Sequence, residues 1–378
     1  MKQNGTIHRI GKAWYGRWRE EVLKDGEVVS VQRNKKLVDY SDRYRTESDV
    51  RPLLDEQIQP LRTGKVKIKS TMLIHEFVDS EYLPYAKEEL KASTAYGYEK
   101  LWKMLSPRLQ KRSLREFRTV DAANLLRDLS GKGWGRRSLQ HAKSFLSGVF
   151  KYAKSVGAFD GENPVRDSLI PRKAAAPEET HATTPEEVLQ MLTALEGNLQ
   201  ARAAVGLMFF AGLRPGEARG ARWEDLDKNR LIVRQSVWRK HVTAPKTESS
   251  IKPVPIIEPL RSILGELREL EGNPSTGPIL KGERMGKPLN LNNLARRVVI
   301  PAFKKAGIPW HGWYSLRRGI GTLVTDVAKD PLAAKGLLRH ANLSTTTAHY
   351  VKDVPESTQR GMMYVEQLFQ RCSNEARA

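Results

Sequence analysis

Four short segments rich in cationic and polar residues follow one another in the second half of the chain. They are residues 210–218 (FAGLRPGEA), 244–247 (APKT), 313–322 (WYSLRRGIGT) and 337–350 (LLRHANLSTTTAHY). Guanidinium groups give permanently charged, bidentate hydrogen bonds to phosphate oxygens. A phenol can act as a nucleophile once a cationic neighbourhood or a base lowers its pKa from about 10. The residue types are those that chemistry on a phosphate group needs.

Other common catalytic signatures are absent from the sequence. There is no Walker-type phosphate loop, no HExxH zinc motif, no CxxC pair and no calcium loop. Two-metal nucleases need clustered carboxylates to hold their ions, and the scattered Asp and Glu residues form no convincing set. The sequence therefore predicts an activity that uses no metal and no cofactor.

The four segments resemble the conserved boxes of the tyrosine recombinases, the phage integrase type of site-specific DNA recombinase. The resemblance covers about residues 184–352. A single box would be weak evidence, whereas five residue types in the family's order are specific. The residues that carry the resemblance are, in order, Arg214, Lys246, Arg317, His340 and Tyr350.

The resemblance implies a role for each of these side chains. Arg214 and Arg317 would hold the two non-bridging oxygens of the scissile phosphate, where charge grows in the transition state. Tyr350 would be the nucleophile and Lys246 the general acid for the leaving 5′ oxygen. His340 would bond the phosphate or assist proton transfer. The resulting 3′-phosphotyrosine bond would conserve the phosphodiester energy, so that rejoining needs no ATP.

Three positions depart from the family pattern. One is Arg318, which stands where the family commonly has a histidine after the second arginine, and we expect this change to leave the site unaltered. Tyr314 stands three residues before Arg317, where the family usually has a histidine, and we expect its phenol to donate a hydrogen bond to a phosphate oxygen. Arg339 replaces the glycine common before the last histidine, a change that we expect to leave the site unaltered. Glu217, three residues after Arg214, is expected to orient it rather than react. Taken alone, an arginine such as Arg214 is more often a surface or helix-terminal ion-pair residue, with Glu217 as its partner.

Composition indicates the kind of partner. The 378 residues include 64 Lys and Arg against 43 Asp and Glu, a formal net charge of +21, which favours a polyanion such as nucleic acid or an acidic membrane surface. Hydrophobic residues make up 39%, enough for packed cores. The single cysteine, Cys372, excludes a disulfide framework and suits a reducing cytoplasm. No signal sequence or membrane-spanning run is recognisable, so we expect no membrane partner.

The expected fold is mainly α with small β elements, in three domains. Residues 1–65 would form a small β-rich sheet module of the arm-binding type, with a hairpin around an Asp-Gly turn. On its second strand, Arg17 and Arg19 would share one face, which either contacts DNA or is simply solvated.

Residues 66–175 would form a helical core-binding domain and residues 176–378 a mixed α+β catalytic domain with a C-terminal helix. A helix over 138–153 would carry lysines beside its apolar stripe, either on DNA phosphates or on an ordinary surface. These DNA-binding candidates are Lys143, Lys151 and Lys154. Thr184 is expected to cap the first catalytic-domain helix, and strands are expected over 231–237 and 252–257. The apolar residues of the C-terminal helix would pack within the chain or dock on a neighbouring protomer.

The sequence thus predicts a site-specific recombinase that integrates or excises a phage or mobile element. Its expected partners are double-stranded DNA attachment sites, three further copies of itself in a homo-tetramer, and an accessory directionality or bending protein. Two alternatives are a sequence-specific DNA-binding regulator without catalysis, and an enzyme that relaxes DNA in the manner of type IB topoisomerases.

Overall fold

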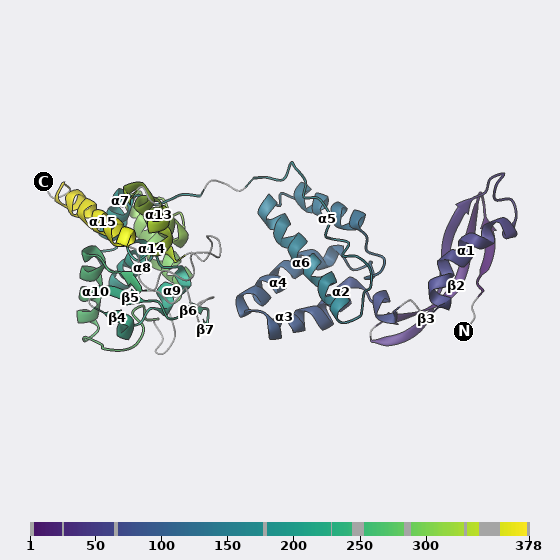
Figure 1. The fold of residues 1–378 in the computed structure, drawn as a ribbon, viewed down its shortest axis with the longest axis horizontal. Coiled ribbons are helices and arrows are strands. Elements are labelled where there is room, and N and C mark those ends of the chain that lie inside the picture. Colours follow the sequence, from purple (N-terminus) through teal and green to yellow (C-terminus); the bar gives the residue numbers. More distant parts are fainter. Residues whose placement is uncertain are drawn as a thin grey trace. The chain divides into compact units, whose positions relative to one another are not determined.

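A computed structural model describes most of the chain. The described residues are 4–24, 26–63, 67–176, 180–227, 229–243, 253–282, 289–328, 331–339 and 356–375. The chain divides into two compact units, Met1–Glu178 and Glu179–Ala378. The predicted fold class is confirmed, because the described residues are mostly helical and carry small antiparallel sheets (Figure 1). The finer division at residues 65 and 175 stays a prediction.

The first unit begins with a three-stranded antiparallel sheet in the order β1-β2-β3. Its strands are β1 (Thr6–Ile10), β2 (Ala13–Lys24) and β3 (Glu27–Asp39), and α1 (Glu47–Arg62) follows them. The predicted hairpin is confirmed by the pairing of β2 with β3. Helix α1 packs on one face of the sheet (Figure 1). Its residues Val50, Leu54 and Ile58 are fully buried.

The rest of the first unit is a helical bundle. Its elements are η1 (Ile68–Thr71), α2 (Ile74–Phe77), η2 (Val78–Tyr82), α3 (Leu83–Glu89), α4 (Ala92–Leu105), η3 (Ser106–Arg108), α5 (Thr119–Gly131) and α6 (Arg136–Ser155). Helix α6 contains the helix predicted over 138–153. Phe145, Val149 and Phe150 are buried on its apolar side, as the spacing of these residues predicts.

The second unit is built around helices α8 and α13. Its helices are α7 (Pro185–Ala194), α8 (Leu199–Phe209), α9 (Pro215–Gly220), η4 (Trp223–Asp225), α10 (Glu258–Leu270), α11 (Leu291–Leu294), η6 (Ala295–Val299), α12 (Ile300–Ala306), α13 (Trp313–Ala328), α14 (Pro331–Leu338) and α15 (Glu356–Glu375). Thr184 caps α7 as predicted: its hydroxyl accepts from the Glu187 N–H at 3.3 Å, and the Glu187 carboxylate accepts from the Thr184 N–H at 2.8 Å. No helix among the described residues has both the length and the apolar character of a membrane span.

The small strands of the second unit form two sheets rather than following the predicted pattern. One sheet pairs β4 (Leu226–Asp227), β5 (Arg230–Ile232) and β8 (Pro253–Pro255), and the other pairs β6 (Ser236–Trp238) with β7 (His241–Thr243). The single strand expected over 231–237 is therefore wrong. It breaks at residues 233–235, because the chain leaves β5 there and packs against α9, where the Gln235 amide donates to the Gly220 carbonyl at 3.0 Å.

Helix α15 packs on its own chain. Met362, Val365 and Phe369 are buried in the core of the second unit, and the Phe369 ring lies 5.0 Å from the Phe210 ring. These residues thus pack within the single chain, and docking of the C-terminal helix on a neighbouring protomer stays a prediction.

Candidate active site

Glu217 organises the cluster of charged groups at the start of α9. Its side chain is buried and accepts two hydrogen bonds from Arg214, one from the backbone N–H and one from Nη1, each 2.8 Å long. Pro215 starts the helix directly after Arg214, so the spacing of three residues brings carboxylate and guanidinium together across the first turn. The guanidinium of Arg214 remains partly exposed, with 36% of its side chain accessible.

Two further arginines reach the same carboxylate from distant parts of the chain. Arg339, which follows α14, donates from Nη2 to Glu217 Oε2 at 2.6 Å. Arg317 of α13 places its Nη1 3.8 Å from that oxygen. One buried carboxylate therefore lies among three guanidiniums, and the cluster keeps an excess of positive charge. Such an arrangement can hold an anion at the accessible edge of Arg214.

Arg317 is fixed by backbone carbonyls. It is 5% exposed and donates to the carbonyls of Gly212 and Leu338. Gly212 lies between α8 and α9, and Leu338 is the last residue of α14. Gly212 has a φ of +58°, a left-handed conformation that glycine adopts without strain, and this turn brings its backbone under α14. The guanidinium is thus oriented before any ligand arrives, which is the property that electrostatic catalysis requires.

Helix α13 is held in place by the chain that enters the second unit. The Thr183 N–H donates to the Ser315 carbonyl at 3.2 Å, and the Thr183 hydroxyl donates to the Ser315 hydroxyl at 2.9 Å. A Cβ at Gly319 would lie only 2.0 Å from the Thr183 carbonyl oxygen. The helix that carries Arg317 therefore depends on a backbone contact that only glycine allows.

The charges in the cluster shift one another's pKa values. Burial alone would raise the pKa of Glu217, but the Arg339 charge and the hydrogen bonds from Arg214 hold it below the usual 4.5. Burial, together with repulsion from the neighbouring Arg214, lowers the pKa of Arg317 to about 9. Burial also lowers the pKa of Arg339. At neutral pH Glu217 is ionised and Arg317 is still charged.

Not every predicted site residue can be placed in this cluster. Arg214, Glu217 and Arg317 come together as described above. Tyr314 lies one helical turn before Arg317 on α13, with 55% of its surface exposed, so its hydroxyl is accessible to a ligand. Lys246, His340 and Tyr350 lie outside the described residues.

Arg339 is the residue whose part in the site was not foreseen. The expectation that an arginine at this position leaves the site unaltered is wrong, because its guanidinium is buried against Glu217. The signal in the sequence was the departure itself, a long cation where the resemblance leads one to expect glycine.

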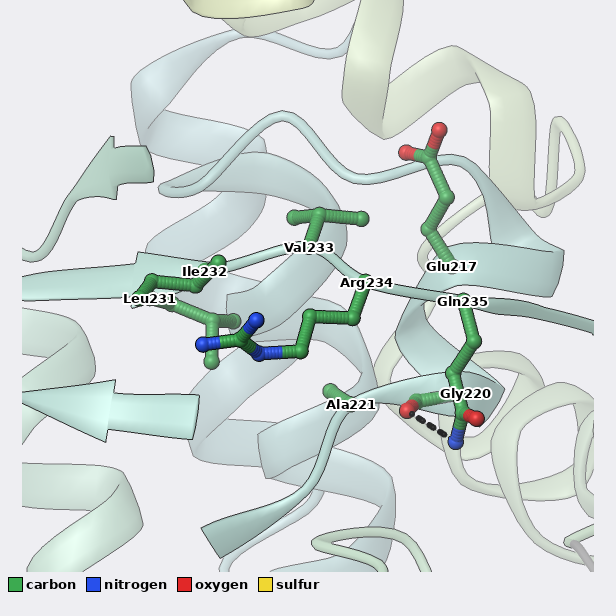
Figure 2. A pocket seen from close by; sticks show the side chains of 8 residues that line it. All are labelled: Glu217, Gly220, Ala221, Leu231, Ile232, Val233, Arg234 and Gln235. Carbon is green, nitrogen blue, oxygen red and sulfur yellow. Dashed lines mark hydrogen bonds between the residues drawn. The ribbon is translucent and has the colours of Figure 1, made fainter. Parts of the chain in front are cut away.

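A small hollow lies beside the cluster, between α9 and the segment that connects β5 to β6 (Figure 2). Glu217 lies at one end of it, and Gly220 and Gln235 meet at another. A Cβ at Gly220 would be 2.7 Å from the Gln235 carbonyl oxygen, so the connecting segment passes directly over bare helix backbone. This contact fixes α9, and with it Arg214, on the small strands.

The DNA-binding candidates of the first unit differ in their surroundings. Arg17 and Arg19 are exposed on one face of β2, and their strand neighbours Trp18 and Glu20 are buried on the other. The ammonium of Lys143 donates to the Ser168 carbonyl at 2.5 Å, so the chain itself uses that charge. The other two lysine candidates, Lys151 and Lys154, are exposed on α6.

The sequence of this chain is similar to those of known proteins. Residues 181–356 match the model of the phage integrase family. A protein described as tyrosine recombinase XerC-like, from Caldanaerobacter subterraneus subsp. tengcongensis, is 24% identical over 399 residues, which cover 97% of this chain and 94% of that protein.

Solved structures share the fold. A Tn1549 transposon integrase in complex with transposon right end DNA superposes with a TM-score of 0.61, at 19% identity, over 78% of this chain and 99% of that one. A lambda integrase dimer bound to a core site gives a TM-score of 0.57 at 22% identity, over 91% of this chain and 93% of that one. A lambda integrase tetramer bound to a Holliday junction gives 0.57 at 20% identity, over 92% and 98% of the two chains.

Proposed function

The chain carries a phage integrase family domain and is a tyrosine recombinase, and from this premise we propose that it cuts and rejoins double-stranded DNA at specific sites through a covalent 3′-phosphotyrosine intermediate. The reaction would use neither a metal nor ATP. It would integrate or excise a phage or another mobile element.

The observation that carries the proposal is the cluster of three arginines around Glu217. Cleavage of a phosphodiester builds negative charge on the non-bridging oxygens, and fixed donors stabilise that charge without having to reorganise. Arg317 is held by the carbonyls of Gly212 and Leu338, and Arg214 by Glu217. We assign both guanidiniums to the scissile phosphate, which would lie at the exposed edge of Arg214. The hydroxyl of Tyr314 would add a hydrogen bond to the same phosphate.

The remaining steps use residues assigned from the sequence. The Tyr350 oxygen would attack phosphorus, forming the tyrosyl bond as the bond from phosphorus to the 5′ oxygen breaks. Lys246 would give its proton to the departing 5′ oxygen, and His340 would bond the phosphate or assist proton transfer. Rejoining would reverse these steps with the 5′ hydroxyl of a second strand.

DNA binding would involve both units. The exposed face of β2 presents Arg17 and Arg19, and the register places Asn34 and Gln32 of β3 beside them. Arginines bind phosphates or guanine edges, amide side chains can read adenine, and a β-ribbon fits the major groove. We propose that this face binds arm-type DNA while the catalytic unit, with Lys151 and Lys154 of α6, binds the core site. Four protomers would act together, in the cytoplasm, with an accessory bending or directionality protein.

The decisive experiment follows covalent complex formation on DNA. The full chain is incubated, with EDTA present, with a duplex that carries the element's attachment site and a nick beside the scissile phosphate, so that the cut strand is lost and the adduct accumulates. We expect a protein–DNA adduct with the natural protein and none with Tyr350→Phe, which should still bind the duplex. Tyr364→Phe is the matched control, since Tyr364 is an exposed tyrosine on α15.

Each other outcome has a definite meaning. An adduct that persists in Tyr350→Phe would assign the nucleophile elsewhere. Specific binding by the natural protein without any adduct would favour the non-catalytic regulator. Relaxation of plasmids that lack paired sites, without recombination of plasmids that have them, would favour the topoisomerase-like activity.

A further inference from the structure

Arg339 has an unusual backbone and an unusual place for a charge. Its φ is +50°, in the left-handed region that strains a residue with a Cβ and that glycine adopts freely. Its side chain is completely buried. Burying a guanidinium is expensive unless it is paired. A strained backbone and a buried charge at one residue persist only where the surroundings require that side chain.

The contacts of Arg339 connect it to Arg214 through one carboxylate. Nη2 of Arg339 donates to Glu217 Oε2 at 2.6 Å, the oxygen that also accepts from the Arg214 backbone N–H at 2.8 Å. The other oxygen, Oε1, accepts from Arg214 Nη1 at 2.8 Å. With one side held by Arg339, the carboxylate cannot rotate without breaking a charged hydrogen bond. Its orientation in turn fixes the guanidinium of Arg214.

We propose that Arg339 is a positioning residue for strand cleavage, which holds Glu217 in the orientation that presents Arg214 to the scissile phosphate. This inference rests on the proposed function. The side chain of Arg339 has no accessible surface, so it would act through Glu217 without touching DNA. Its second contact, from Nη1 to the Leu337 carbonyl at 3.3 Å, ties the end of α14 to the same carboxylate.

The first test compares substitutions at this position. Arg339→Met removes the charge at similar length, and Arg339→Gly also relieves the left-handed strain. Arg202→Met is the matched control, because Arg202 likewise pairs with a glutamate, Glu266, at 3.0 Å, and its Nε, like that of Arg339, is buried without a partner among the described residues.

The measured quantities are the single-turnover rate of adduct formation on the nicked duplex and the affinity for that duplex. We expect both Arg339 variants to form adduct about 10- to 100-fold more slowly, with affinity kept within a few-fold. The control should match the natural protein. Because glycine accepts the backbone conformation, equal rates for Arg339→Gly and the natural protein would overturn the inference. If Arg339→Met does not fold, Arg339→Lys decides the question: it keeps a charge but lacks the planar fork, so a slower rate supports the inference and an unchanged rate overturns it.

A double-mutant cycle separates positioning from general support of the fold. If Arg339 acts through Glu217, then replacing Arg339 by Met in a Glu217→Gln background should slow adduct formation by no more than about 3-fold, because the shared carboxylate is already lost. If the rate reductions caused by Arg339→Met and Glu217→Gln multiply in the double variant, Arg339 supports the site independently of Glu217, and the inference is overturned.

The pH profile gives a readout that a purely structural role would not move. The Arg339 charge is a principal cause of the lowered pKa of Glu217, so its removal raises that pKa. As pH falls, adduct formation by Arg339→Met should decline at a higher pH than it does in the natural protein, and in Arg339→Lys the shift should be smaller. If the rate of adduct formation falls at the same acidic pH in Arg339→Met and in the natural protein, the proposal is contradicted. An absence of adduct in the natural protein would instead refute the proposed function.

Discussion

Arginines lie in two different environments in the described parts of this protein, and burial distinguishes them. Around Glu217, Arg317 and Arg339 are buried and bonded to a carboxylate or to backbone carbonyls. On β2, Arg17 and Arg19 project from an open sheet face whose other side packs against α1. The first group is held among buried polar groups before DNA arrives, whereas the second lies on an exposed strand face. We therefore expect the buried group to set the rate of the chemistry and the exposed group to set affinity.

The sharpest way to test the comparison is to remove a buried cation. We expect Arg317→Ala to reduce single-turnover adduct formation by about 1000-fold, the size of effect seen when a preorganised donor to a transition-state charge is lost, while affinity for the nicked duplex changes little. Arg268→Ala is a suitable control, since Arg268 also donates to a backbone carbonyl, that of Pro274, at 3.0 Å. If Arg317→Ala loses affinity as much as it loses rate, Arg317 contributes to DNA binding, and the buried and exposed arginines do not differ in the way expected.

A smaller effect is expected from the packing that supports Arg317. Gly319→Ala forces a Cβ to within 2.0 Å of the Thr183 carbonyl oxygen, and overpacking of this kind costs about 1–3 kcal/mol or more. Gly265→Ala on α10 is the matched control, because a Cβ there meets nothing within 4 Å. In a helix interior that change should stabilise by roughly 0.5–1 kcal/mol. The urea concentration at the midpoint of unfolding of the full chain should therefore fall in Gly319→Ala and rise in Gly265→Ala. Equal midpoint shifts in the two variants would show that α13 tolerates movement.

The sequence was sufficient to predict contacts between residues that lie close together in the chain. The capping of α7 by Thr184, the pairing of β2 with β3 and the alternation of Arg17 with buried neighbours were all predictable, because each depends on residues within one turn or one hairpin. The contact between Arg214 and Glu217 follows in the same way from a spacing of three residues.

Contacts between distant segments were beyond these rules. Nothing in the periodicity of residues 331–338 indicates that the next residue, Arg339, will meet Glu217, because that contact depends on how α14 docks near α9. The apolar stripe of α15 predicted burial but not which surface buries it. The sequence over 231–237 predicted one strand but carried no information on its partners. In the structure this segment contributes β5 to one sheet and β6 to another.

The smallest expected effect concerns the exposed arginines. Each phosphate that a cation neutralises releases counterions and adds about 0.9 to the slope of log affinity against log salt. The double variant Arg17→Ala/Arg19→Ala should therefore bind a mixed-sequence duplex with a slope shallower by about 1.8, with the loss of affinity largest at low salt. Its rate of adduct formation on saturating nicked core duplex should stay near that of the natural protein.

The control for the sheet face is Lys35→Ala, because the Lys35 ammonium donates to Gln57 on α1 at 2.7 Å and so lies on the side away from Arg17. Fluorescence anisotropy across a salt series measures all three proteins. If Lys35→Ala lowers the slope as much per charge as the double variant does, binding reflects net charge rather than this face. If the double variant lowers the cleavage rate on saturated core duplex, the exposed arginines also act in catalysis. A change confined to the slope would mean that these arginines supply affinity alone, since attraction to phosphates needs no directional hold of the kind that the transition state requires.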